Sequence, residues 1–244
     1  MPSGIEVRVS GANAARGYQQ ACALAESGAA ALISFGLAGG LDPRLGPGRV
    51  IIGTEVLAVE GAVRDPRGAQ SLGETLGAIF SVRGHAARRA EAPPPVTVDE
   101  RYTADQRLIE LLFKAGGKGA VVGPVAGVDH LVRTRDEKAA LLVKTRALAA
   151  DMESQGVARA ATERGLPFGV IRVVVDPSNR ELPEALARAV RPDGSTALAP
   201  ILNSLLLNPF GLGGYMSVAL DSAIALRRLG RVGRSVGAAL LGGL

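Results

Sequence analysis

The chain has 244 residues, of which 47% are hydrophobic and 21% charged, with a formal net charge of +5. This length suits one large α/β domain, or at most two small ones, and the composition excludes a chain that is disordered throughout. Aromatic residues make up only 3%, so nucleic acid is a poor explanation for the positive charge. The single cysteine, Cys22, excludes a disulfide framework within the chain and fits a reducing compartment.

The first part of the sequence alternates between strand and helix patterns. Ile5–Val9 predicts a short strand, and the Ala-rich segment after it predicts a helix that runs to about Glu26 and stops at Gly28. Ala29–Phe35 is an uninterrupted apolar run, which is typical of a strand covered on both faces. The glycine-rich segment Gly36–Gly40 then predicts a turn.

The alternation continues through the rest of the chain and predicts an α/β fold. Residues 61–95, rich in Gly, Arg and Ala, predict a surface excursion between elements. The remaining predicted elements are strands at Val50–Glu60, Gly119–Val122 and Phe168–Val175, and helices at Asp105–Lys114, Arg135–Lys144 and Met152–Arg164.

The C-terminal segment differs in kind, so we divide the chain into an α/β domain (1–207) and a basic apolar tail (208–244). Residues 194–220 carry no charge, but Pro, Asn and Gly interrupt them, whereas a membrane span takes about 20 mainly apolar residues in sequence. Tyr215–Leu229 predicts a helix, with Met216, Ala219, Leu220 and Ile224 on one side and with Arg227, Arg228, Arg231 and Arg234 at or beyond its end. Two interpretations stay open: the tail binds an anionic membrane surface, or it packs on the domain or on an oligomer partner.

Two carboxylates follow predicted strands. Glu153 lies in Asp151–Ser154, and Asp176 ends the apolar run Phe168–Val175. In an open α/β sheet both would lie at the carboxyl edge, where ligands bind, close to Gly36–Gly40.

Each acid has a structural and a functional interpretation. Glu153 could complement the dipole of its helix, or it could grip two vicinal hydroxyls of a ribose. Asp176 could cap the next helix, or desolvation could raise its pKa and keep it protonated. A protonated Asp donates to purine N7 while accepting from a 6-amino group, which fits adenine better than a 6-oxo purine.

Several other chemistries lack their motifs. Gly36–Gly40 does not have the spacing of the dinucleotide fingerprint, and no phosphate loop or Gly-x-Ser-x-Gly motif occurs. His85 and His130 are too few and too poorly placed for a zinc site. We therefore expect no metal and no cofactor. No N-terminal segment joins basic residues to an apolar run, so we also expect no signal peptide.

Three segments, in their order and spacing, resemble the superfamily of purine nucleoside phosphorylases and methylthioadenosine/adenosylhomocysteine nucleosidases: Ile33–Leu41, Ala150–Glu153 and Val170–Asp176. A narrower set resembles the hopanoid-associated phosphorylase branch of that superfamily: Ser34–Pro43, Asp151–Ser154, Asp176-Pro177, Leu182-Pro183, Arg191–Gly194 and the arginine-rich tail. The resemblance implies a three-layer fold, with a central mixed twisted sheet flanked by helices, and a homo-oligomer.

The resemblance also implies an activity, namely cleavage of the N-glycosidic bond to adenine, in adenosylhopane, by phosphate or water. Glu153 would bind the ribose hydroxyls and Asp176 would protonate or hydrogen-bond N7. The other implied contacts are Gly36, Leu37, Ala38, Gly39, Met152 and Arg172 for the substrate, and Ser10 and Gly11 for phosphate or a loop. Phosphate would be a co-substrate rather than a cofactor, and the enzyme would be cytoplasmic, with peripheral contact at the inner membrane surface.

The sequence also departs from the family pattern. It begins with what resembles the family's second strand, so the first strand and its loop are expected to be missing, along with the groups that the loop supplies for the nucleophile. Two further hypotheses therefore stay open. One is a hydrolytic nucleosidase for small thio-adenosines, and the other is a catalytically silent relative that binds nucleosides.

Overall fold

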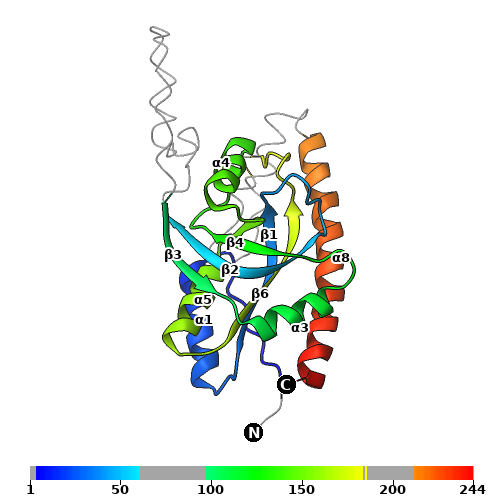
Figure 1. The fold of residues 1–244 in the computed structure, drawn as a ribbon. Coiled ribbons are helices and arrows are strands. Elements are labelled where there is room, and N and C mark those ends of the chain that lie inside the picture. Colours follow the sequence, from blue (N-terminus) through cyan, green and yellow to red (C-terminus); the bar gives the residue numbers. More distant parts are fainter. Residues whose placement is uncertain (1–3, 61–96, 184, 186–211, 244) are drawn as a thin grey trace.

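The computed structural model describes residues 4–60, 97–183, 185 and 212–243, and a mixed sheet forms its centre (Figure 1). The strand order is β3-β2-β4-β5-β1-β6, and β2 also pairs with β6, so five strands close into a ring to which β3 is added. The strands are β1 (Leu32–Gly40), β2 (Val50–Glu60), β3 (Thr97–Thr103), β4 (Val121–Gly127), β5 (Ala149–Asp151) and β6 (Phe168–Asp176).

Helices flank this sheet on both sides and at one end. Figure 1 shows α1 and α5 side by side on one side, and α8 with α3 beside it on the other. The helices are α1 (Ala14–Glu26), α3 (Gln106–Gly116), α4 (Arg135–Thr145), α5 (Ser154–Glu163) and α8 (Leu212–Gly243). The expected α/β fold, with a central mixed sheet between helices and a C-terminal helix, is therefore confirmed.

Short polar side chains fix where the predicted helices begin. Asn13 accepts a hydrogen bond from the backbone of α1, and Asp105 accepts two from the backbone of α3. Thr134 and Glu137 form a capping box at the start of α4. These bonds satisfy backbone N–H groups that have no partner within the helix, which explains why these starts were predictable.

Two predictions about the elements were wrong, and one strand was missed. Ile5–Val9 has the alternation of a strand, but among the described residues it pairs with no strand, and Val7 and Val9 are exposed. Gly36–Gly40 does not turn the chain but continues β1, because its hydrogen bonds are made to β5 and β6. Strand β3 was not predicted, since its exposed charged residues conceal the pattern of an edge strand.

The C-terminal helix is far longer than predicted and is docked on the domain along one face. Ala225, Val232 and Val236 are buried, and Arg180 of the loop after β6 forms an ion pair with Asp221 at 2.7 Å. None of the helices in the described ranges combines the length and the apolarity that crossing a bilayer requires. The predicted boundary at 207, the excursion at 61–95 and the motif at 191–194 lie outside the described residues.

Helices α1 and α5 approach so closely that glycine is needed at their contact. A Cβ atom on Gly156 would lie 2.0 Å from the backbone oxygen of Ala14, and one on Gly17 would lie 3.0 Å from the backbone oxygen of Glu153. This contact holds the segment that precedes α1 next to the start of α5, where Glu153 lies.

We expect Gly156→Ala to lower the free energy of unfolding by about 1–3 kcal/mol, because the new methyl group meets backbone that cannot rotate away. Gly230→Ala is the matched control, since Gly230 is exposed on α8 with nothing within 4 Å of its Cβ position. There the substitution should be neutral or stabilise the helix by up to about 1 kcal/mol. Denaturant unfolding of both variants measures the difference, and equal stabilities would contradict the close packing.

Candidate active site

A buried arginine joins the elements of the site. Arg172 lies in the middle of β6 and is fully buried. Its Nε donates to Asp151 Oδ2 at 2.6 Å, and its Nη2 donates to the hydroxyls of Ser34 and Ser154 at 2.5 and 2.8 Å. Because a buried charge is tolerated only when it is paired and hydrogen-bonded, this network fixes the guanidinium in one orientation.

Asp151 also organises the turn that carries Glu153. Its Oδ1 accepts from the backbone N–H groups of Glu153 and Ser154, both at 2.7 Å. Burial alone would raise the pKa of Asp151, but the Arg172 guanidinium and the hydroxyl of Ser154 hold that pKa below its ordinary value. Glu153 itself stands at the N-cap position of α5 without making a side-chain capping bond. Asp151 therefore supplies the side-chain bonds to the backbone at the start of α5, and the Glu153 carboxylate is not used for them.

The Glu153 carboxylate and an unpartnered donor of Arg172 both lie beside Gly36. Oε2 of Glu153 lies 3.8 Å from Nη2 of Arg172, and the carboxylate accepts a hydrogen bond from the side chain of Ser10. Burial raises the pKa of the Glu153 carboxyl, and Arg172 partly offsets this rise. Nη1 of Arg172 is buried and has no hydrogen-bond partner among the described residues. It lies 2.8 Å from where a Cβ on Gly36 would be, so a donor and a carboxylate meet beside this glycine.

Two glycines of β1 make room for charged side chains of β6. The β1–β6 register shifts by one residue between Ala38 and Gly39, so Gly36 pairs with Arg172 and Gly39 pairs with Asp176. A Cβ on Gly39 would lie 3.2 Å from Asp176 Oδ1. Glycine in a strand commonly marks such a close approach or a bulge, so the glycines of this segment make room for side chains rather than a turn.

Asp176 ends β6 and is held by a lysine that the sequence analysis did not single out. Lys138 of α4 is fully buried, and its Nζ lies 2.5 Å from Asp176 Oδ2. Burial raises the pKa of Asp176, as expected, but the ammonium of Lys138 opposes this rise.

The two carboxylates do not share one edge of the sheet. Asp176 lies at the carboxyl end of β6, as predicted, whereas Glu153 lies beside Gly36 in the middle of β1, because β5 runs antiparallel to β1. Gly36 and Gly39 are three residues apart, so the two acids are separated by roughly 10 Å along the strand.

The remaining predicted residues are placed as follows. Ser10 reaches Glu153, and Gly11 has a positive φ of 61° in the turn before α1. Ala38 is buried in the main hydrophobic core and Leu37 packs against it. Met152 packs against a second apolar cluster. Substrate contact by Leu37, Ala38 and Met152 stays a prediction.

Four residues of the site were missed by the sequence analysis: Ser34, Lys138, Asp151 and Ser154. Asp151 and Ser154 flank Glu153, so a carboxylate and a hydroxyl at the start of a predicted helix were an available signal. Lys138 gave none, because a lysine in a helix is normally solvated.

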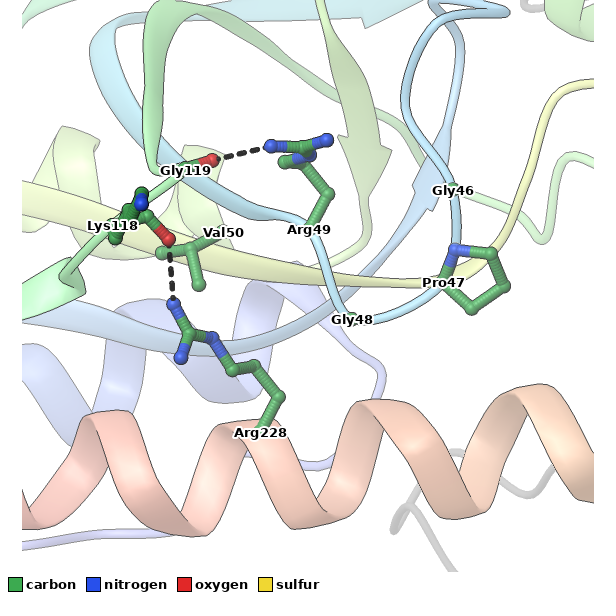
Figure 2. A pocket seen from close by; sticks show the side chains of 8 residues that line it. All are labelled: Gly46, Pro47, Gly48, Arg49, Val50, Lys118, Gly119 and Arg228. Carbon is green, nitrogen blue, oxygen red and sulfur yellow. Dashed lines mark hydrogen bonds between the residues drawn. The ribbon is translucent and has the colours of Figure 1, made fainter.

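A cavity of about 230 Å³ lies elsewhere and shares no residue with this site (Figure 2). Its lining is Gly46, Pro47, Gly48, Arg49, Val50, Lys118, Gly119 and Arg228. Arg49 donates to the carbonyl of Gly119 at 2.8 Å, and Arg228 donates to that of Gly116 at 2.9 Å. The cavity is basic, which suits an anion rather than a neutral nucleoside. In the described part of the chain, no three His, Cys, Asp or Glu side chains gather to hold a metal.

The chain is thus an α/β protein with a buried polar site, in which the carboxylates of Asp151 and Glu153 lie next to Arg172. A family model described as "Phosphorylase superfamily" matches residues 4–206, so the chain belongs to the phosphorylase superfamily. It is an enzyme of the nucleoside phosphorylase or nucleosidase type. The hopanoid-associated branch is not distinguished by this match.

Solved structures with the same fold support the architecture. The chain is similar to the 5′-methylthioadenosine/S-adenosylhomocysteine nucleosidase of Neisseria meningitidis in complex with methylthio-immucillin-A, with a TM-score of 0.57, 21% identity, and coverage of 93% of this chain and 78% of that chain. It is also similar to the corresponding nucleosidase of Helicobacter pylori (TM-score 0.52, 16% identity, 91% and 76% coverage). Futalosine hydrolase of Helicobacter pylori gives a TM-score of 0.50, with 18% identity and 70% and 65% coverage. No curated protein matches the chain significantly.

We expect Asp151→Asn to lower the free energy of unfolding by about 3–5 kcal/mol, because Arg172 would remain buried without its counter-ion. Asp129→Asn is the control, since that side chain is 52% exposed, and its effect should stay within about 0.5 kcal/mol. Because the folded pKa of Asp151 is depressed, its stabilisation is present above its unfolded pKa and is lost as the pH falls through its folded pKa. Chemical denaturation at neutral and acidic pH measures both effects, and a variant as stable as the wild type would refute the ion pair.

Proposed function

We propose that this enzyme cleaves the N-glycosidic bond of an adenine nucleoside. The observation that carries the proposal is the unpartnered, buried Nη1 of Arg172 beside the Glu153 carboxylate. A group with a pair of hydroxyls satisfies both, since a hydroxyl accepts from the guanidinium and donates to the carboxylate. Asp176, roughly 10 Å away along β1, is separated from this point by about the length of a nucleoside with a hydrogen bond at each end.

At the ribose end, Glu153 is the group that stabilises the charge that forms during the reaction. As the bond from C1′ to N9 breaks, the sugar gains the character of an oxocarbenium ion, and a carboxylate near its hydroxyls stabilises that positive charge. Ser10 and Arg172 hold the carboxylate in place from two sides. An oriented charge of this kind stabilises the transition state more than the ground state.

At the base end, Asp176 is the acid. The electron pair of the broken bond passes into the purine, and N7 takes a proton from the Asp176 carboxyl, which becomes a carboxylate. Burial raises the pKa of Asp176 and Lys138 opposes this rise, so the carboxyl can both take up the proton and donate it to N7. The second oxygen accepts from the 6-amino group, which favours adenine.

The nucleophile is phosphate or water. Phosphate attacks C1′ through an oxygen atom and gives a ribosyl phosphate, whereas water attacks C1′, loses one proton and gives a free ribosyl product. The Arg172 guanidinium supports an anion near C1′, whereas Glu153, with its raised pKa, supports activation of water. The two outcomes differ in whether the rate depends on phosphate.

For the substrate, we propose a lipid-linked adenosine of the adenosylhopane type. The support is the resemblance of motifs such as Asp151–Ser154 and Asp176-Pro177 to the hopanoid-associated branch, together with the basic C-terminal helix. A small thio-adenosine is the alternative, because two similar structures are named as nucleosidases for 5′-methylthioadenosine and S-adenosylhomocysteine. A homo-oligomer is proposed on the family resemblance alone.

We expect Asp176→Asn and Glu153→Gln each to lower the rate of adenine release by about 10²–10⁴, because each removes one charge-bearing group of the transition state. Asp99→Asn and Glu110→Gln are matched controls on exposed positions and should retain full activity. Adenine is measured by chromatography with 5′-deoxyadenosine, 5′-methylthioadenosine and adenosylhopane, each with and without phosphate.

The outcomes separate the hypotheses. Release that requires phosphate identifies a phosphorylase, and release that ignores phosphate identifies a nucleosidase. Binding of adenosine without any release from the wild type would identify a catalytically silent relative. A wild type that neither releases adenine nor binds adenosine would refute the proposal.

We further propose that α8 contacts an anionic membrane surface with its outer face. Met216, Leu220 and Leu226 are exposed on this helix although they are apolar. Arg227, Arg231 and Arg234 are exposed among them, so the outer face joins apolar and basic side chains as interfacial helices do. The basic cavity beside Arg228 adds further positive charge next to the helix (Figure 2).

We expect replacement of Arg227, Arg231 and Arg234 by Gln to abolish most of the binding to vesicles containing phosphatidylglycerol, since each cation near such a surface contributes about 1 kcal/mol. The control removes the same charge elsewhere, by replacing the exposed Arg107, Arg135 and Lys144 with Gln. Vesicle sedimentation at low and high salt measures binding. A wild type that ignores anionic vesicles would show that this face serves another purpose.

A further inference from the structure

Lys138 is bound in a way that fixes its charge. Its side chain is fully buried, and its Nζ donates to Asp176 Oδ2 at 2.5 Å and to the carbonyl oxygens of Pro177 and Arg180 at 3.0 Å each. An ammonium group has three N–H donors, and all three have acceptors here. A neutral amine would have one donor too few, so the site is built for the charged form.

Few other charges act on Asp176 from the elements packed around it. Asp221 of α8 disfavours the Asp176 carboxylate electrostatically, but its own charge is paired with Arg180 at 2.7 Å. Strand β1 contributes Gly39, which has no charge. Lys138 is thus the cation that the described structure places in contact with Asp176.

We propose that Lys138 is a positioning residue for nucleoside cleavage, which holds Asp176 as a carboxylate in the resting enzyme and stabilises that carboxylate again once the proton has moved to N7. The inference rests on the function proposed above. It makes Lys138 the residue that sets the acid strength of Asp176. It follows from geometry: a carboxylate and a fully bonded ammonium in direct contact form a charge-assisted pair.

Asp176 takes up one proton from solvent when the nucleoside binds, because a purine substituted at N9 offers N7 only as an acceptor. The proton passes to N7 as the bond from C1′ to N9 breaks and its electron pair enters the base. Asp176 returns to the carboxylate, and Lys138 keeps its three protons throughout.

The pH dependence of turnover tests this role. The active complex needs protonated Asp176, so kcat/KM is full below the pKa of Asp176 and falls as the pH rises through it. Lys138→Met keeps an unbranched side chain of similar shape but removes the charge, which should move this descending limb up by about 1–3 pH units and lower kcat by about 10²-fold. Lys138→Arg retains the charge and should leave the limb in place. A slower Lys138→Met enzyme with an unmoved limb would reduce Lys138 to a packing role and overturn the proposal.

A binding measurement on the wild type keeps the proposal testable if Lys138→Met does not fold. The probe is 4-amino-5H-pyrrolo[3,2-d]pyrimidine, which carries an N–H donor at the position of purine N7 and therefore prefers an ionised Asp176. Its affinity should be constant around neutral pH and weaken on acidification. The control is 7-deazaadenine, which has C–H there and should show no such dependence. An affinity for the first probe that rises through neutral pH would show that Asp176 is protonated at rest, and the proposal would fail.

The two proposals fail in different ways. If the wild type releases no adenine from any nucleoside and binds neither probe, the proposed function is wrong. If it releases adenine, but the pH profile and the probe affinity do not respond as described, only the role of Lys138 is wrong.

Discussion

The buried ion pair between Arg172 and Asp151 is the interaction on which the rest of the site depends. A guanidinium with no exposure has to be neutralised inside the protein, and Asp151 does this while also binding the backbone at the start of α5. The same aspartate therefore fixes the arginine on β6 and the turn that carries Glu153. With these two positions fixed, the unpartnered Nη1 of Arg172 and the carboxylate of Glu153 both lie beside Gly36.

The space for this network comes from glycine rather than from a loop. Strand β1 passes the charged side chains of β6 at Gly36 and Gly39, and any larger residue would meet Arg172 or Asp176. The one-residue shift in register before Gly39 brings both glycines to the same row of β6 side chains. A closed sheet then keeps this strand pair rigid, since β2 pairs with β6 and leaves no free edge there.

Glu153 and Asp176 differ in their burial and in the charges of their neighbours. Glu153 is partly exposed, and its partners Ser10 and Arg172 only moderate the effect of burial. Asp176 is buried and meets a full ammonium charge on Lys138. Two carboxylates in environments that differ this much suit two roles, stabilisation of charge for one and proton transfer for the other. Helix α8 has an inner face that is packed on the sheet and an outer face that remains basic and apolar.

The sequence by itself determined the class of fold, because continuous apolar runs such as Phe168–Val175 and capping residues such as Asp105 specify local structure. It also indicated Glu153, Asp176 and Arg172, since their types and spacing resemble a family. The tertiary structure alone decided that Gly36–Gly40 is strand, because pairing with β5 and β6 overrides the local preference of glycine for turns. It also decided that Lys138 is a buried partner of Asp176, since that contact joins residues 38 positions apart that only the fold brings together.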